Sequence, residues 1–213
     1  MSNTDSFIEE VTEEVRRDRL FALMRRYGWI ALTAVLIAVG GAAWNEYRKA
    51  SQRAAAEALG DAILAARDTG APAEALAGVE AGTPAGAALV ALLRADALAD
   101  AGDTQAALAV LDGVDAAAGQ VYAQLAALKA LILRGPDMDP AQRVAALAPY
   151  AAPGQPFRLV ALEQQALVQV EAGEIAAAVE TLRDILDAAE TTPGLRQRAT
   201  QMIVALGADP AEA

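Results

Sequence analysis

The feature that most constrains the fold is a run of eighteen uncharged residues, 27–44. At about 1.5 Å per residue, a helix of this length spans roughly 27 Å, which is close to the hydrocarbon thickness of a bilayer. Both tryptophans of the chain, Trp29 and Trp44, lie at the two ends of the run, and Tyr27 and Tyr47 flank them. Indole and phenol rings prefer the boundary between lipid tails and headgroups. We therefore predict a transmembrane helix over residues 27–47, anchored by these four aromatic side chains.

Two other structures could account for the same apolar run. One is the core helix of a soluble domain, but a core helix of this length usually carries charged residues on at least one face. The other is a cleaved export signal, for which residues 41–43 offer small side chains. A signal begins with a short basic segment, whereas 26 residues precede this run and six of them are acidic. An uncleaved single-pass anchor is the interpretation that the sequence favours.

The basic residues on either side of the run indicate its orientation. Five arginines precede it within eleven residues, and three basic residues follow it closely. Because Lys and Arg are retained in the cytoplasm, the N-terminus is expected there and the C-terminal part in the periplasm of a Gram-negative bacterium. Residues 1–26 predict a cytoplasmic amphipathic arm, whose helix starts at a capping box formed by Ser6 and Glu9. The arm is either a docking helix for a cytoplasmic partner or a solvated extension of the anchor.

The composition argues against several classes of function. The chain has no Cys and no His, so it has no thiol nucleophile, no Cys/His zinc site and no Ser-His pair. Its formal net charge is -11, which leaves no basic face for a nucleic acid. We therefore predict a non-enzyme without cofactor or metal, and without a nucleic-acid or small-molecule partner.

Residues 48–207 contain a repeated phrase. "ADALADAGDTQAALAVLDGV" and "QQALVQVEAGEIAAAVETLRDIL" each read as an apolar helix, an Ala-Gly-acid turn and a second helix. Gly173 follows Gly102 by 71 residues, which is about two units of 34 plus an insertion. Second helices are predicted to begin near Pro72, Thr104, Pro140 and Glu174, and a helix over residues 195–206 to close the array. The predicted fold is all-α, with one transmembrane helix, a helical-repeat solenoid and a disordered tail at 208–213.

The unit length and the small residues at fixed positions resemble tetratricopeptide repeats, although the usual Trp and Pro are missing. The small residues are Ala95 and Ala166 on the first helices and Ala107 and Ala178 on the second. The resemblance implies that the first helices line a concave protein-binding face. Its candidate residues are Leu89, Leu92, Asp96, Tyr122, Leu125, Lys129, Val160, Glu163 and Leu167.

Ordinary core packing is the alternative role for the leucines of this set. Asp96, Lys129 and Glu163 are the stronger candidates, because a charge on an otherwise apolar helix face needs water or a partner.

The layout of the whole chain is more specific. A charged arm, "RRYGW" opening one apolar span, "WNEYRKA" closing it and an Ala-rich helix before the repeats resemble the YfgM-like family. Members are ancillary subunits of the SecYEG translocon, with a repeat domain related to that of the cell-division coordinator CpoB. The resemblance implies an inner-membrane protein with a periplasmic repeat domain. It also implies three kinds of protein partner, namely translocon subunits, a periplasmic chaperone and exported chains.

Two alternatives stay open at this point. The chain could be an accessory or assembly subunit of another envelope or respiratory membrane complex. It could also be an envelope hydrolase, although no cluster of residues in the sequence indicates one.

Overall fold

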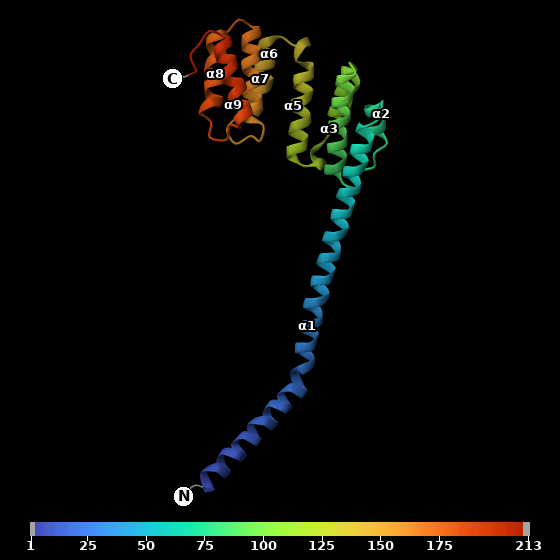
Figure 1. Ribbon diagram of the computed structural model, residues 1–213, viewed down its shortest axis with the longest axis vertical. Helices are drawn as coiled ribbons and strands as arrows, with labels where there is room; N and C mark the ends of the chain where they lie inside the picture. Colours follow the sequence, from blue (N-terminus) through green and yellow to red (C-terminus); the bar gives the residue numbers. More distant parts are fainter. Residues whose placement is uncertain (1–2, 211–213) are drawn as a thin grey trace. The chain divides into compact units, whose positions relative to one another are not determined.

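The protein is described by a computed structural model that covers the backbone of residues 3–210 and the side chains of residues 24–30, 32–135 and 137–210. Every regular element within residues 3–210 is helical (Figure 1), which confirms the all-α prediction. The chain divides into two compact units, Met1–Ala58 and Leu59–Ala213.

The first unit consists of the greater part of one helix, α1 (Asn3–Arg67). The arm and the apolar run were predicted as separate elements, and α1 contains both without a break. The helix begins three residues before the predicted capping residue Ser6, and the side chains of Ser6 and Glu9 lie outside the described ones. Among the described residues, one helical segment, Met24–Arg67, is long and apolar enough to cross a membrane.

The second unit holds the end of α1 and a row of shorter helices. They are α2 (Pro72–Ala77), α3 (Pro84–Asp100), α4 (Thr104–Asp112), α5 (Gln120–Arg134), α6 (Pro140–Ala151), α7 (Arg158–Glu171), α8 (Ile175–Asp187) and α9 (Pro193–Ala205). Two short 3-10 helices, η1 (Ala116–Ala118) and η2 (Gly135–Asp137), lie in the connections. The four predicted starts of second helices agree within one residue with those of α2, α4, α6 and α8. The closing helix α9 begins two residues earlier than predicted, where the Thr192 hydroxyl accepts a hydrogen bond from the Leu195 amide.

Identical turns end the first helices α3 and α7. At the end of α3, the Gly102 amide donates to the Ala99 carbonyl at 2.9 Å, and the Asp103 amide donates to the Leu98 carbonyl at 2.9 Å. The corresponding bonds after α7 run from Gly173 to Val170 at 3.0 Å and from Glu174 to Gln169 at 2.8 Å. This pair of bonds is the Schellman motif, which needs a left-handed residue at the glycine position. Gly102 and Gly173 have φ of +84° and +78°, so glycine is favoured at both turns.

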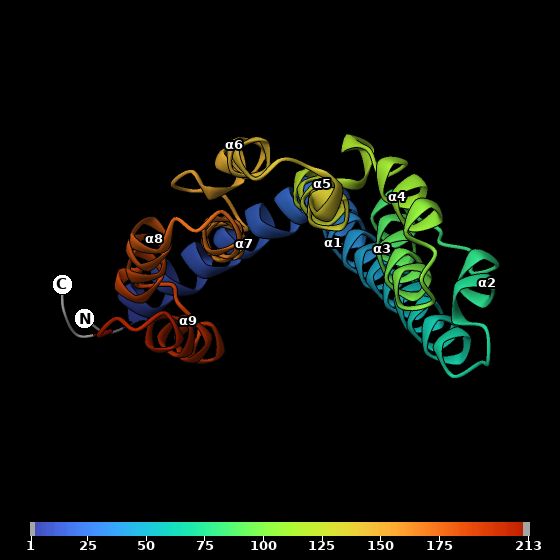
Figure 2. The same cartoon turned by 90° about the horizontal axis from the view of Figure 1, so that it is seen from above.

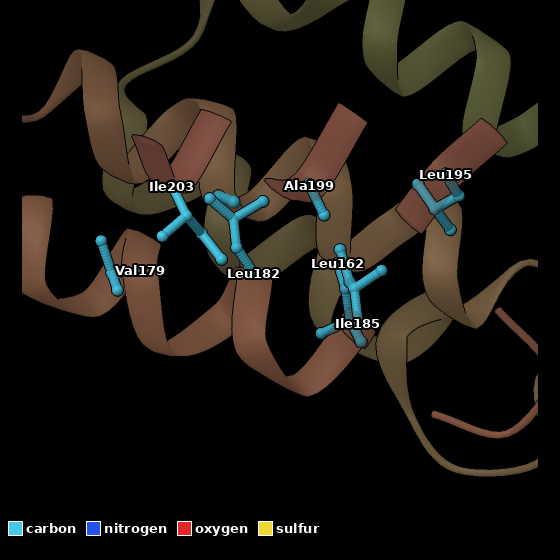
Figure 3. Close-up of a cluster of buried hydrophobic side chains, with 8 residues drawn as sticks. Leu162, Val179, Leu182, Ile185, Leu195, Ala199 and Ile203 are labelled. Atoms are coloured by element: carbon cyan, nitrogen blue, oxygen red, sulfur yellow. The ribbon is translucent and has the colours of Figure 1, made fainter. Parts of the chain in front are cut away.

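Small residues let the helices of a pair pack closely. Ala95 of α3, Ala107 of α4, Ala166 of α7 and Ala178 of α8 are each at most 1% exposed. Around α7, α8 and α9, Ala166 belongs to a core with Leu162, Val179, Leu182, Ile185, Leu195, Ala199 and Ile203 (Figure 3). The four alanines thus occupy the tight positions expected of them.

The middle of the row departs from regular pairing. Helices α5 and α6 were predicted as one pair, but α5 packs mainly on α4 and α6 packs mainly on α7. The cause is the connection at residues 135–139, where η2 and an extended Met138 replace the Gly-acid turn. A small core of Leu128, Leu147 and Val168 still joins α5, α6 and α7.

Candidate protein-binding surface

Three of the first helices lie on one side of the second unit. In the view of Figure 2, α3, α7 and α9 lie along one side of the row, α4, α6 and α8 lie along the other, and α5 lies between these two lines. Three of the predicted apolar surface residues are exposed, namely Leu89 on α3 at 37%, Val160 on α7 at 40% and Leu167 on α7 at 37%. Apolar side chains on two first helices are therefore open to solvent.

Leu92 is a core residue, which corrects its prediction as a partner-binding one. It is 5% exposed and lies in a cluster with Ala95, Leu111 and Ala126. Helix α3 packs against both α4 and α5, so a second face of this helix is covered in addition to the one that meets its pair partner. Tyr122 and Leu125 of α5 are half-buried against the same cluster, where they present less surface than Leu89.

Asp96 and Lys129 form an ion pair between consecutive first helices. The Lys129 Nζ of α5 lies 2.5 Å from the Asp96 Oδ1 of α3. The Lys129 side chain is 29% exposed, and the Asp96 side chain is 50% exposed. These two charges were expected to need water or a binding partner. They are in fact stabilised partly by each other and partly by water.

Glu163 has the same kind of partner at the other end of the row. It is 8% exposed on α7, and both of its carboxylate oxygens accept from Arg198 of α9. The two distances are 2.7 Å from Nε and 2.9 Å from Nη2. The hydrogen bond and the attraction of the carboxylate raise the pKa of Arg198 above its ordinary value. Glu163 is therefore occupied within the chain and is not free for a partner, which corrects its prediction as a binding residue.

Arg198 is a residue of this surface that the sequence reasoning missed. A signal was present, because opposite charges stand about one repeat apart in both pairs. Lys129 follows Asp96 by 33 residues, and Arg198 follows Glu163 by 35. The middle junction has a neutral contact instead, in which the Gln124 Nε2 of α5 donates to the Gln155 Oε1 before α7 at 3.1 Å.

The four predicted anchor residues all lie on the surface of the first unit. Tyr27 is 49% exposed, Trp29 65%, and Trp44 and Tyr47 69% each. The rings of Trp44 and Tyr47 are 6.3 Å apart, and the Arg26 guanidinium lies 5.8 Å from the centre of the Tyr27 ring. No described residue of the most apolar window of this helix is buried against the protein.

The two units differ in charge. Residues 1–58 contain eight basic and eight acidic residues, whereas residues 59–213 contain nine basic and twenty acidic ones. The net charge of -11 therefore belongs entirely to the second unit. In the described part of the chain, acidic side chains form no group of three or more that could hold a metal ion.

Comparison of the chain with protein-family models, with curated proteins and with solved structures gave no match.

Proposed function

We propose that the chain is a membrane-anchored scaffold for protein–protein interactions, and that it serves as an ancillary subunit of the Sec translocon. In this role it links the translocon to periplasmic chaperones that receive exported chains. One observation carries the proposal. A helix segment that is apolar on all sides, with aromatic residues at both ends, is followed in the same chain by paired helices that expose apolar residues.

The energetics of the first unit support membrane anchoring. Six large apolar side chains of this unit are between 47% and 70% exposed, namely Ile30, Leu32, Val35, Leu36, Ile37 and Val39. Removing such a side chain fully from water contributes roughly 1.5–3 kcal/mol. The described structure buries none of them against protein, and a bilayer would bury them all. The arginines before the segment favour a cytoplasmic N-terminus and a periplasmic second unit, in the inner membrane of a bacterium.

The second unit supports the interaction role. Paired helices that end in identical turns and are closed by α9 are typical of a tetratricopeptide-like solenoid. On the first helices, the opposite charges within each of two ion pairs neutralise one another. Leu89, Val160 and Leu167 of these helices are exposed. Such a surface suits an apolar segment of a partner protein, because its own charges are already satisfied.

Membrane anchoring is tested by fractionation and by a reporter fusion. We expect the full-length protein to remain with membranes after alkaline extraction and to be released by detergent. A reporter that is active only outside the cytoplasm should be active when fused to the C-terminus. Release of the intact protein by lysis without detergent would contradict the anchor, and an inactive but stable fusion would contradict the orientation.

The interaction surface is tested by site-specific crosslinking in intact membranes. A photoreactive amino acid is placed at Leu89, Val160 or Leu167, and as a control at the exposed Glu180 or Asp184 of α8. Mass spectrometry should identify translocon and chaperone subunits at the first three positions and not at the controls. Subunits of another envelope or respiratory complex at these positions would instead indicate the alternative assembly. Equal labelling from α8 would remove the argument for this surface.

A further inference from the structure

The pair formed by α3 and α4 contains a groove. Its helix lengths differ from those of the corresponding pair, α7 and α8. Helix α4 has 9 residues, whereas α8 has 13, and the first helix α3 has 17 residues compared with 14 in α7. Because α4 returns from the C-terminal end of α3, it is too short to cover the N-terminal half of that helix. A groove of about 570 Å³ lies there, between α3, the end of α4 and η1.

The walls of the groove are made of small apolar residues. Ala87 and Ala91 line it from α3, Val110 and Gly113 from α4 and its end, and Ala118 from η1. Its volume falls within the roughly 300–1,000 Å³ that is common for ligand sites. Walls of this kind allow the backbone of a ligand to approach the helices closely.

Two charged residues line the groove, and one of them has no partner. The Asp115 carboxylate accepts a hydrogen bond from the Ala117 amide at 2.8 Å and so caps η1. Arg94 is partly buried, its Nε is shielded from solvent, and this atom has no hydrogen-bond partner. Burial of a charged donor without an acceptor is unfavourable, so this side chain is suited to receive an anion.

The other cations of the second unit show that Arg94 is exceptional. Five form ion pairs with carboxylates, namely Lys129, Arg134, Arg143, Arg158 and Arg198. Two more donate to backbone carbonyls, namely Arg183 and Arg196, although the Nε of Arg183 is itself buried without a partner. Arg67 is exposed to water. Within the described residues of this unit, Arg94 is the one partly buried cation without an ion pair or hydrogen bond.

We propose that this groove binds a short extended peptide segment that carries a carboxylate, and that Arg94 receives the carboxylate. One planar guanidinium matches one carboxylate, with two parallel hydrogen bonds. A phosphate dianion would need further donors, and the net charge of -11 on this unit opposes it more strongly than a single carboxylate. The small walls let the backbone of an extended peptide lie close to α3 and to the end of α4.

This site is separate from the surface assigned to the proposed function. Arg94 and Asp96 are two positions apart on α3, so they project about 200° apart around the helix. Asp96 points toward Lys129 of α5, and Arg94 lines the groove beside the end of α4. The inference therefore stands whether or not the partner of the first-helix surface is a translocon subunit.

The test measures peptide binding to the full-length protein in detergent by fluorescence anisotropy. The probe is a labelled, C-terminally amidated peptide of sequence Gly-Ala-Ala-Glu-Ala-Ala, compared with its Gln counterpart. A third probe is the Gln peptide with a free C-terminal carboxylate, which distinguishes a terminal carboxylate from a side-chain one. We expect saturable binding of at least one carboxylate peptide below about 1 mM, and binding of the amidated Gln peptide at least tenfold weaker. Inorganic phosphate should not displace the bound peptide.

Variants of the groove identify the site. Arg94→Gln should weaken binding about 10- to 100-fold, as expected for loss of charge-assisted hydrogen bonds, and Arg94→Lys should restore part of it. Ala87→Leu should also weaken binding, because it fills the groove from an exposed position. Arg67→Gln removes the same charge outside the groove and should have no effect. The melting temperature of Arg94→Gln should be no lower than that of the parent protein.

The following results would overturn the inference. They are absence of saturable binding by the parent protein, equal binding of the amidated Gln peptide, displacement by phosphate, and unchanged binding in Arg94→Gln. If Arg94→Gln fails to fold, Ala87→Leu decides the question, since unchanged binding in that variant would place the peptide elsewhere.

Discussion

Replacing Ala178 with leucine tests how closely the helices of a pair approach. Ala178 on α8 and Ala166 on α7 are both fully buried, and these two helices pack against each other. A leucine at position 178 adds three carbon atoms at a site without space for them. Overpacking of this kind typically costs 1–3 kcal/mol. We expect a loss of about 2–3 kcal/mol, because the alanine is fully buried against a neighbouring helix.

The loss should be visible in a thermal melt of the full-length protein in detergent. For a unit of about this size, 1 kcal/mol shifts the melting temperature by roughly 2–4 °C, so Ala178→Leu should lower it by about 4–12 °C. Circular dichroism at the helix band follows the transition. Hydrogen exchange should show the loss of protection in peptides from α7 and α8, because the misfit is local.

Ala176 provides the matched control on the same helix. It is exposed and lies two positions from Ala178, so it projects about 200° away from it. Ala176→Leu makes the same chemical change and should alter stability by no more than about 0.5 kcal/mol. If Ala178→Leu melts together with this control or above the parent protein, the helices do not cross as closely as their small residues indicate.

Two further changes test the turn and the ion pair. Gly173→Ala should lower the free energy of unfolding by about 1–2 kcal/mol in a urea unfolding curve, because φ is +78° while the space around the added methyl is open. Gly70→Ala adds its methyl in open space too, but without a positive φ, and should lower the free energy of unfolding by less than half as much. Equal losses in the two variants would contradict the conformational explanation. Arg198→Gln should increase hydrogen exchange in α7 and α9 more than Glu163→Gln does. The first variant leaves the buried Glu163 carboxylate unpaired, whereas the second leaves the Arg198 guanidinium, which water reaches. Pairing raises the pKa of Arg198, so from pH 7 to pH 9, well below the ordinary pKa of arginine, its stabilising effect is fully present. The loss of protection in each variant should therefore match at pH 7 and pH 9. A larger effect of Glu163→Gln, or a strong difference between the two pH values, would refute this account.

Local signals in the sequence were sufficient to place most helices. The turns at Gly102 and Gly173 combine a left-handed residue with a following acidic residue, and both signals are read within six residues. Pro72 and Pro140 stand at the first positions of α2 and α6, where proline is favoured. Helix starts and ends are therefore predictable because the physics that fixes them is confined to neighbouring residues. The 3-10 helix η1 (Ala116–Ala118) was not predicted, since three alanines carry no periodic signal.

The burial of particular side chains could not be predicted in the same way. The repeat positions predicted Leu92 as a residue of the concave face, but this side chain packs in a cluster with residues of α4 and α5. Whether a position on a repeat helix is core or surface depends on the next pair along the row. Glu163 fails for the same reason, because its partner Arg198 belongs to a helix that the sequence reasoning considered only as an apolar cap.

The distribution of charge connects the two units to one proposed role. The charges of the first unit sum to zero, because its eight basic residues equal its eight acidic ones, so no net repulsion opposes the proposed insertion among anionic lipids. The second unit has eleven more acidic than basic residues, and anionic headgroups repel it. An Ala- and Leu-rich unit with exposed apolar side chains would otherwise tend to adhere to a lipid surface. The excess of acid therefore favours a state in which Leu89, Val160 and Leu167 remain available to proteins instead of lipid.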